Sequence, residues 1–133
     1  MYQLICRLRK YERGQSLVEL ALVLPILIIL LFGILEFGRV FHSYLVITNA
    51  AREGARHGII CRDVTGIKQK VLDSSPGINL EPGDITVNPS TGLTTGVPLT
   101  VSVEYNLAIL TPVLSEIIPN PVPISATSTM RVE

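Results

Sequence analysis

The sequence predicts an α+β fold, in which one long N-terminal helix precedes a small three-stranded antiparallel sheet with short helices. The first observation is that residues 20–35 contain no charged side chain, and that this stretch continues without a break signal into an amphipathic segment ending near Gly58. The second is that residues 99–105 and 124–132 alternate apolar and polar side chains, which is typical of half-buried strands.

The apolar stretch is long enough to cross a membrane. From Gln15 to Leu35 an α-helix would measure about 31 Å at ~1.5 Å per residue, and the hydrocarbon core of a bilayer is roughly 30 Å thick. The alternative is a buried helix of a soluble domain, but the run is too long and too uniformly apolar for a chain of 133 residues. We therefore assign residues 15–58 to one long helix, transmembrane over 15–36 and amphipathic beyond.

The distribution of charge predicts the orientation of this span. Residues 1–14 carry four basic side chains and one acidic one, whereas the rest of the chain carries seven basic and ten acidic ones. Positive flanks are retained in the cytoplasm, so the N-terminus is expected inside and residues 59–133 outside. The chain has no net charge and no basic stripe, which argues against a nucleic-acid partner.

Glu19 is the unusual residue of the span, because a carboxylate at the membrane centre costs roughly 2.5–3.5 kcal/mol. One interpretation is that its side chain reaches the headgroups near the cytoplasmic interface. The other is that it pairs with a positive group of another chain, and the α-amine that cleavage after Gly14 would create at Gln15 is such a group. Pro25 lies inside the run and can kink the helix, since it lacks a backbone donor.

Small residues recur at helical spacing in the amphipathic part of the helix and form a face that another backbone can approach closely. The sequence leaves open which of two partners packs against this face: the helix's own domain or a neighbouring subunit. The residues expected to pack in this way are Ala51, Gly54, Ala55 and Gly58.

Residues 59–133 are expected to form a small exported α+β domain. The apolar spacing over 67–72 predicts a short helix, and Thr111 followed by Pro112 predicts the start of another. Strands are predicted over 84–88, 99–105 and 124–132, with a rigid proline connector over 119–123. A domain of this size is marginally stable alone, so packing against the long helix would help it.

No motif for catalysis or cofactor binding is present in the sequence. His57 and Cys61 are four residues apart, but a structural zinc site needs two further ligands. We therefore expect no enzyme activity, no cofactor and no metal site. Cys6 and Cys61 lie on opposite sides of the proposed span, so Cys61 is either a free thiol or a bridge between subunits.

The N-terminal half of the chain resembles a known family. The stretches RGQSLVELALVLPILIILLFGILEFGRVFH and TNAAREGAR are similar to the N-terminal region of TadE-like minor pilins, or pseudopilins, of the tight-adherence (Flp-type) pilus system. The resemblance is close over about 45 residues and weakens after Gly58. Leu20 follows Glu19 where the major pilins of this system usually have tyrosine, which favours a minor subunit.

The resemblance implies a pilin-like fold and a set of partners. Residues 1–14 would be a prepilin leader, removed by a prepilin peptidase between Gly14 and Gln15, and Glu19 would meet the new N-terminus of a neighbouring subunit. Other pilin subunits, the pilus assembly platform and the membrane are the implied partners. The implied location is the bacterial inner membrane, as a single-pass protein, or the extracellular pilus. The alternative is an uncleaved single-pass protein with an exported binding domain.

Overall fold

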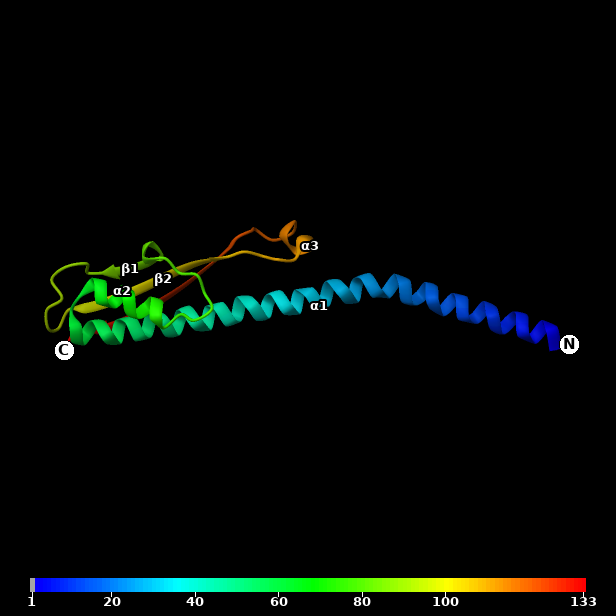
Figure 1. Cartoon of the computed structure of the whole chain (residues 1–133), viewed down its shortest axis with the longest axis horizontal. Coiled ribbons are helices and arrows are strands. Elements are labelled where there is room, and N and C mark those ends of the chain that lie inside the picture. The colour runs from blue at the N-terminus through cyan, green and yellow to red at the C-terminus, as the bar shows by residue number, and fades with distance from the viewer. Residues whose placement is uncertain (1) are drawn as a thin grey trace. The chain divides into compact units, whose positions relative to one another are not determined.

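A computed structural model describes the backbone of residues 2–133 and the side chains of residues 14–112 and 114–133. The chain consists of a long helix followed by a three-stranded antiparallel sheet with short helices, so the predicted α+β class is confirmed (Figure 1). It divides into two compact units, Met1–Glu36 and Phe37–Glu133. The elements are α1 (Tyr2–Cys61), α2 (Val64–Asp73), a 3-10 turn η1 (Pro82–Asp84), β1 (Ile85–Asn88), β2 (Pro98–Leu107), α3 (Pro112–Ser115) and β3 (Val122–Arg131).

Helix α1 is longer at both ends than the predicted range of 15–58. Its backbone is already helical from Tyr2, because no proline or glycine occurs before Gly14 to interrupt it. At the other end the helix continues past Gly58 to Cys61, where Arg62 takes a positive φ of 53° and donates its N–H to the Gly58 carbonyl at 3.0 Å. A residue in this left-handed conformation is a common way of ending a helix.

Helix α2 begins immediately after this turn. Asp63 has an extended backbone, and its carboxylate accepts hydrogen bonds from the N–H groups of Thr65 at 3.3 Å and Gly66 at 2.8 Å. These bonds satisfy donors that the first turn of a helix leaves unpaired. The cap places the start of α2 at Val64, three residues before the apolar pattern that predicted it.

The sheet has the order β1-β2-β3, and both pairs of strands are antiparallel. All ten residues of β2 pair with β3, from Pro98 opposite Arg131 to Leu107 opposite Val122. β2 therefore extends beyond the predicted range of 99–105 at both ends. β3 begins two residues before the predicted range of 124–132 and ends one residue before its last residue. Pro123, expected in a connector, lies within β3; β3 is an edge strand, where a missing backbone donor is tolerated.

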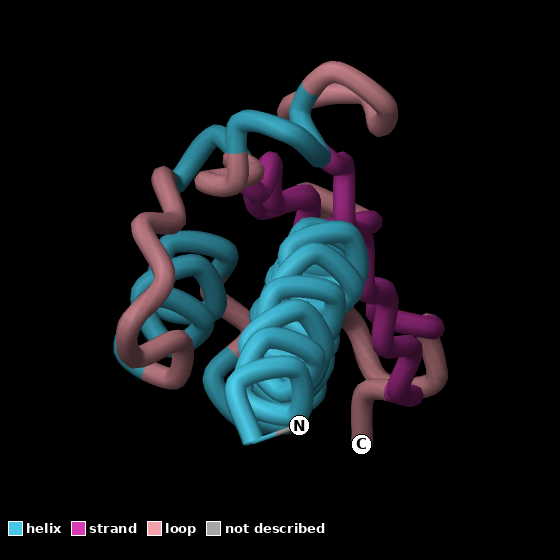
Figure 2. The backbone as a smooth tube through the Cα atoms, turned by 90° about the vertical axis from the view of Figure 1, so that its right-hand side faces the viewer, coloured by secondary structure: helices cyan, strands magenta, loops and turns pink. Residues whose placement is uncertain are grey.

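The core of the second unit lies between one face of the sheet and two helices. Leu99, Val101 and Val103 alternate along β2 with more exposed residues and are fully buried. Figure 2 shows α1 lying between α2 and the strands. Most of the fully buried apolar side chains come from α1, α2 and β2, and β1 and the residue after β3 add Ile85 and Val132. The others include Ile47, Ala50, Ala55, Ile67, Val71, Leu99, Val101 and Val103.

Two contacts show that β2 runs antiparallel to α1. Near the start of β2, Leu99 lies against Gly58 in the last turn of α1. Just beyond the end of β2, the backbone carbonyl of Ala108 accepts from the guanidinium of Arg39 at 3.5 Å. The turn that joins β2 to β3 therefore lies beside the part of α1 near residue 39, and the C-terminus lies beside the end of α1.

Candidate functional site

The apolar part of α1 is exposed along its length. The chain contains, among the residues that the structure describes, one helix that is long and apolar enough to cross a membrane. None of its most apolar window is buried, unlike the core helix of a soluble protein. The large side chains between Leu17 and Leu35 are between 41% and 70% exposed, for example Ile28 and Leu22. This surface is suited to lipid or to apolar helices.

The predicted cleavage and pairing residues lie together at the start of this exposed segment. Glu19 is exposed, and its carboxylate accepts a hydrogen bond at 3.4 Å from the side-chain amide of Gln15, one helical turn earlier. Gly14 faces open space, since a Cβ atom built on it would meet nothing within 4 Å. The carboxylate is therefore accessible to a partner, while cleavage after Gly14 and pairing with another chain stay predictions.

Pro25 lies inside α1, and the helix continues on both sides of it. The proline is thus accommodated within the helix. The kink expected from its missing donor stays a prediction.

The face of small residues packs against the chain's own domain. Ala51 and Ala55 are almost completely buried. A Cβ atom built on Gly54 would meet Val71 of α2, and one built on Gly58 would meet Leu99 of β2 and lie 2.6 Å from Ile67 Cδ1. Of the two occupants that the sequence left open, the structure therefore places the domain of the same chain on this face.

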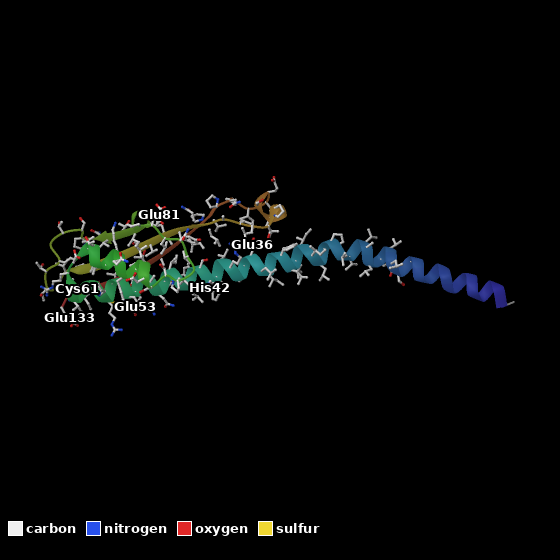
Figure 3. All side chains as sticks on the ribbon, in the orientation of Figure 1. Glu36, His42, Glu53, Cys61, Glu81 and Glu133 are labelled. Atoms are coloured by element: carbon white, nitrogen blue, oxygen red, sulfur yellow. The ribbon has the colours of Figure 1, made fainter. Side chains whose placement is uncertain are left out.

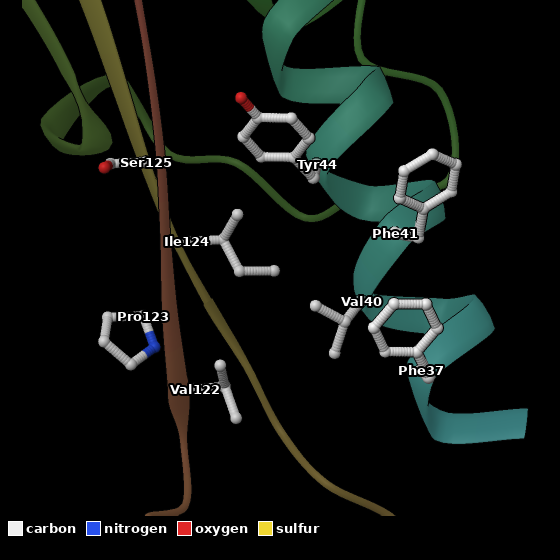
Figure 4. Close-up of a pocket in the computed structure, with 8 residues that line it drawn as sticks. All are labelled: Phe37, Val40, Phe41, Tyr44, Val122, Pro123, Ile124 and Ser125. Atoms are coloured by element: carbon white, nitrogen blue, oxygen red, sulfur yellow. The ribbon is translucent and has the colours of Figure 1, made fainter. Parts of the chain in front are cut away.

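Three aromatic residues of α1 line an apolar cleft against the start of β3 (Figure 4). Phe37, Phe41 and Tyr44 are 72%, 54% and 46% exposed. The cleft has a volume of about 340 Å³, and its opposite wall is formed by residues 122–125. These aromatic side chains begin with Phe37, the residue directly after the predicted span of residues 15–36, and aromatic residues gather at membrane interfaces.

Cys61 is a free, exposed thiol at the end of α1, with its Sγ atom 3.9 Å from Nδ1 of His57. Figure 3 shows Cys61 at the same end of the second unit as Glu133, whose backbone carbonyl accepts a hydrogen bond from Arg62. Within residues 14–112 and 114–133, no group of three or more histidine, cysteine or acidic side chains is placed to hold a metal.

Sequence reasoning missed a further exposed apolar group in the connection between β2 and β3, residues 108–121. Leu110 and Ile117 are each 73% exposed, and Ile118 is 43% exposed. A signal was available, because this connection carries a single charged residue, Glu116, although loops are usually polar.

The described residues thus combine an exposed helix of membrane-spanning length with a small antiparallel sheet. Residues 14–56 match the family model of TadE-like proteins. The match confirms the resemblance predicted from the sequence and supports a protein associated with the tight-adherence pilus. Searches of curated proteins and of solved structures returned no match.

Proposed function

We propose that the chain is a minor pilin or pseudopilin that takes part in assembling a tight-adherence (type IVc-like) pilus, or forms part of it, for adhesion or secretion. The observation that carries the proposal is the family match over 14–56, which includes Gly14, Gln15 and Glu19. In this role a prepilin peptidase of the inner membrane removes residues 1–14. The domain outside the membrane offers a surface to other subunits and performs no catalysis.

Glu19 sets the register between subunits in this proposal. Its carboxylate is exposed. Among the described contacts it accepts a hydrogen bond from the side chain of Gln15 at 3.4 Å, which is long and therefore weak for such a bond. In an apolar environment a carboxylate is far more stable beside a positive group than alone. The new α-amine at Gln15 of a neighbouring chain provides that group. The apolar surface of residues 17–35 supplies the area of helix contact.

The processing step is tested by the N-terminus of the mature protein, measured by mass spectrometry from cells that contain the cognate prepilin peptidase. We expect a chain that begins at Gln15, either free or cyclised to pyroglutamate. The variant Gly14→Val should remain uncut. Gly33→Val is the matched control, because a side chain added at either glycine meets open space; it should be processed normally. A wild-type chain that begins at Met1 would overturn the processing step.

The alternative function is that of an uncleaved single-pass protein whose outer domain binds a partner. Glu19→Leu separates the two functions. Removing a charge from the span makes membrane insertion of a plain anchor more favourable, whereas a pilin would lose the group that pairs with its neighbour. We expect this variant to reach the membrane at normal levels but to abolish pilus assembly. Assembly is measured by the amount of filament that can be sheared from the cells. Glu19→Gln tests whether charge rather than shape is needed. Normal assembly by both variants would favour the alternative.

A further inference from the structure

The apolar cleft between α1 and β3 is left unfilled by its own chain. Both of its walls, residues 37–44 and residues 122–125, belong to the compact unit Phe37–Glu133. Figure 4 shows Val40 and Ile124 pointing into the space between the helix and the strand. Phe41 is 54% exposed. A cavity of about 150 Å³ holds a benzene ring, so a cleft of about 340 Å³ has room for roughly two apolar side chains.

The connection between β2 and β3 has the complementary shape, an apolar projection. Leu110 and Ile117 are each 73% exposed, and Ile118 is 43% exposed. The backbone N–H groups of Ile117 and Ile118 donate to the Leu114 carbonyl at 3.1 and 2.9 Å, and these bonds hold the two isoleucines in an ordered turn after α3. Clustered exposed apolar side chains of this kind mark an interaction site.

The projection and the cleft lie at the same end of this unit. The guanidinium of Arg39, on the helix that forms one wall of the cleft, donates to the Ala108 carbonyl at 3.5 Å, where the connection begins. The connection ends directly before the strand residues of the other wall. Both apolar surfaces are nevertheless exposed, so the chain does not use one to cover the other. Two copies that lie side by side with parallel α1 segments would bring them together without a shift along the helix.

The charges at this end of the unit have opposite signs on the two surfaces. Over residues 37–51, α1 carries one side chain that is charged at pH 7, Arg39. Residues 108–121 carry one charged side chain, Glu116, which is exposed. The connection of one copy therefore meets a helix segment of opposite charge in the next. Two connections or two clefts that faced each other would instead bring like charges together.

The other surfaces of the unit are less suited to a neighbouring copy. Ala51 and Ala55, on the face of small residues, are almost completely buried by the chain's own domain. The outer face of the sheet is polar, with a hydroxyl pair between Ser102 and Thr127 at 3.1 Å. The cleft and the connection thus offer apolar contact area that these two faces do not.

We propose that the apolar cleft receives the β2–β3 connection of a second copy of this chain. Apolar side chains of the connection, Ile117 among them, enter beside Phe41 of the second copy, and Glu116 comes to lie near Arg39 of that copy. The proposal deepens the proposed function and rests on it for its setting, because it names the surface through which subunits of an assembly touch. It requires neither the cleavage step nor the charge pairing described there.

The test is cysteine cross-linking of the full chain in the membranes of cells that produce two versions with different affinity tags. Both versions carry Cys6→Ser and Cys61→Ser; one adds Ile117→Cys and the other adds Phe41→Cys. A mild oxidant joins the two thiols where their Cα atoms come within about 4.4–6.8 Å. Ile60→Cys replaces Ile117→Cys in the control, because Ile60 is an equally exposed isoleucine, at 75%. It lies 19 residues from Phe41, about 28 Å along the same helix.

We expect the product that carries both tags to be several times more abundant for residues 41 and 117 than for residues 41 and 60. Phe37→Cys, at a side chain that is 72% exposed, repeats the test from the same wall of the cleft. Circular dichroism of the purified variants checks that they are folded. Equal products with Ile117→Cys and Ile60→Cys would overturn the proposal. So would the absence of a doubly tagged product from folded Phe41→Cys and Phe37→Cys chains.

Glu116→Lys tests the arrangement of charge in the same assay. It turns a positive side chain toward Arg39 of the second copy, so the doubly tagged product should fall by at least about twofold. Glu104→Lys is the matched control, since it is the same change at an exposed glutamate of β2, and it should leave the product unchanged. Equal products from the two lysine variants would overturn this placement of the connection. The N-terminal mass, measured on the same samples, reports processing at Gly14 separately, so an intact cross-link in an uncleaved chain would overturn the processing step alone.

Discussion

Single residues determine how closely α1 approaches the rest of its domain. Gly54 and Gly58 occupy positions where the neighbouring side chains of α2 and β2 leave no room for a methyl group. Glycine costs up to ~1 kcal/mol relative to alanine inside a helix, so its presence here is explained by packing rather than by helix propensity. Arg62 and Asp63 then turn the chain from α1 into α2.

We expect Gly58→Ala to destabilise the domain by about 1–3 kcal/mol, the usual cost of overpacking a filled core. The added Cβ would clash with Leu99 and lie 2.6 Å from Ile67 Cδ1. Gly38→Ala is the control, because the same change in the same helix meets nothing within 4 Å. It should be neutral or stabilise by up to about 1 kcal/mol. Denaturant unfolding of both variants in detergent measures the difference, and equal stability would contradict the packing described.

At the level of elements, α2 is attached to α1 mainly through its buried apolar side chains, Ile67 and Val71. Ile67 is fully buried and lies against the glycine face of α1. The outer face of the sheet is polar by contrast, with hydroxyl pairs such as Thr100–Thr129 at 3.0 Å. The interior of the unit is thus held together by one apolar layer between helices and sheet.

Ile67→Ala should therefore cost about 2–5 kcal/mol, as expected for deleting a buried aliphatic side chain. Ile60→Ala is the matched control, since it is the same change in a helix at a side chain that is 75% exposed, and it should alter stability by less than about 0.5 kcal/mol. Thermal unfolding followed by circular dichroism compares the two. Similar losses for both variants would show that α2 does not dock through Ile67.

The elements also show what sequence reasoning could predict. Alternation located β2 and β3, because one face of each strand is buried and the other is exposed. The last residue of α1 and the first residue of α2 are harder to predict, since they depend on the positive φ of Arg62 and the cap by Asp63, which leave no periodic pattern. The occupant of the small-residue face could not be chosen either, because helical spacing defines a face but not its partner.

For the whole molecule, the boundary between the two compact units does not fall where the helix ends. The sequence suggested an outer domain of residues 59–133, whereas the compact unit of the structure begins at Phe37. The reason is that α1 contributes Ile47, Ala50 and Ala55 to the core that covers the sheet.

We therefore expect a fragment of residues 37–133 to unfold cooperatively, and a fragment of residues 59–133 to lack a stable fold. The shorter fragment would expose the inner face of β2, including Leu99 and Val101, to water. A domain of about 75 residues buries little apolar surface and is only marginally stable. Dispersion of amide signals in nuclear magnetic resonance spectra distinguishes the two. A well-dispersed spectrum from residues 59–133 would show that the sheet does not need α1.

The exposure of one part of α1 and the burial of another have a consequence for how the sequence can change over generations. Substitutions at the buried positions between residues 47 and 58, such as Ile47, Ala50 and Ala55, are limited by the chain's own folding, because those side chains lie in its core. Substitutions between residues 17 and 35 are limited by the surroundings of this exposed segment, such as lipid or other apolar helices, and not by the folding of the chain. A single helix is thus subject to two separate selective pressures. In a library of variants scored first for folding, we expect substitutions at the buried positions of residues 47–58 to be rejected and those in residues 17–35 to be tolerated. Scoring the same library for assembly would then test the substitutions in residues 17–35.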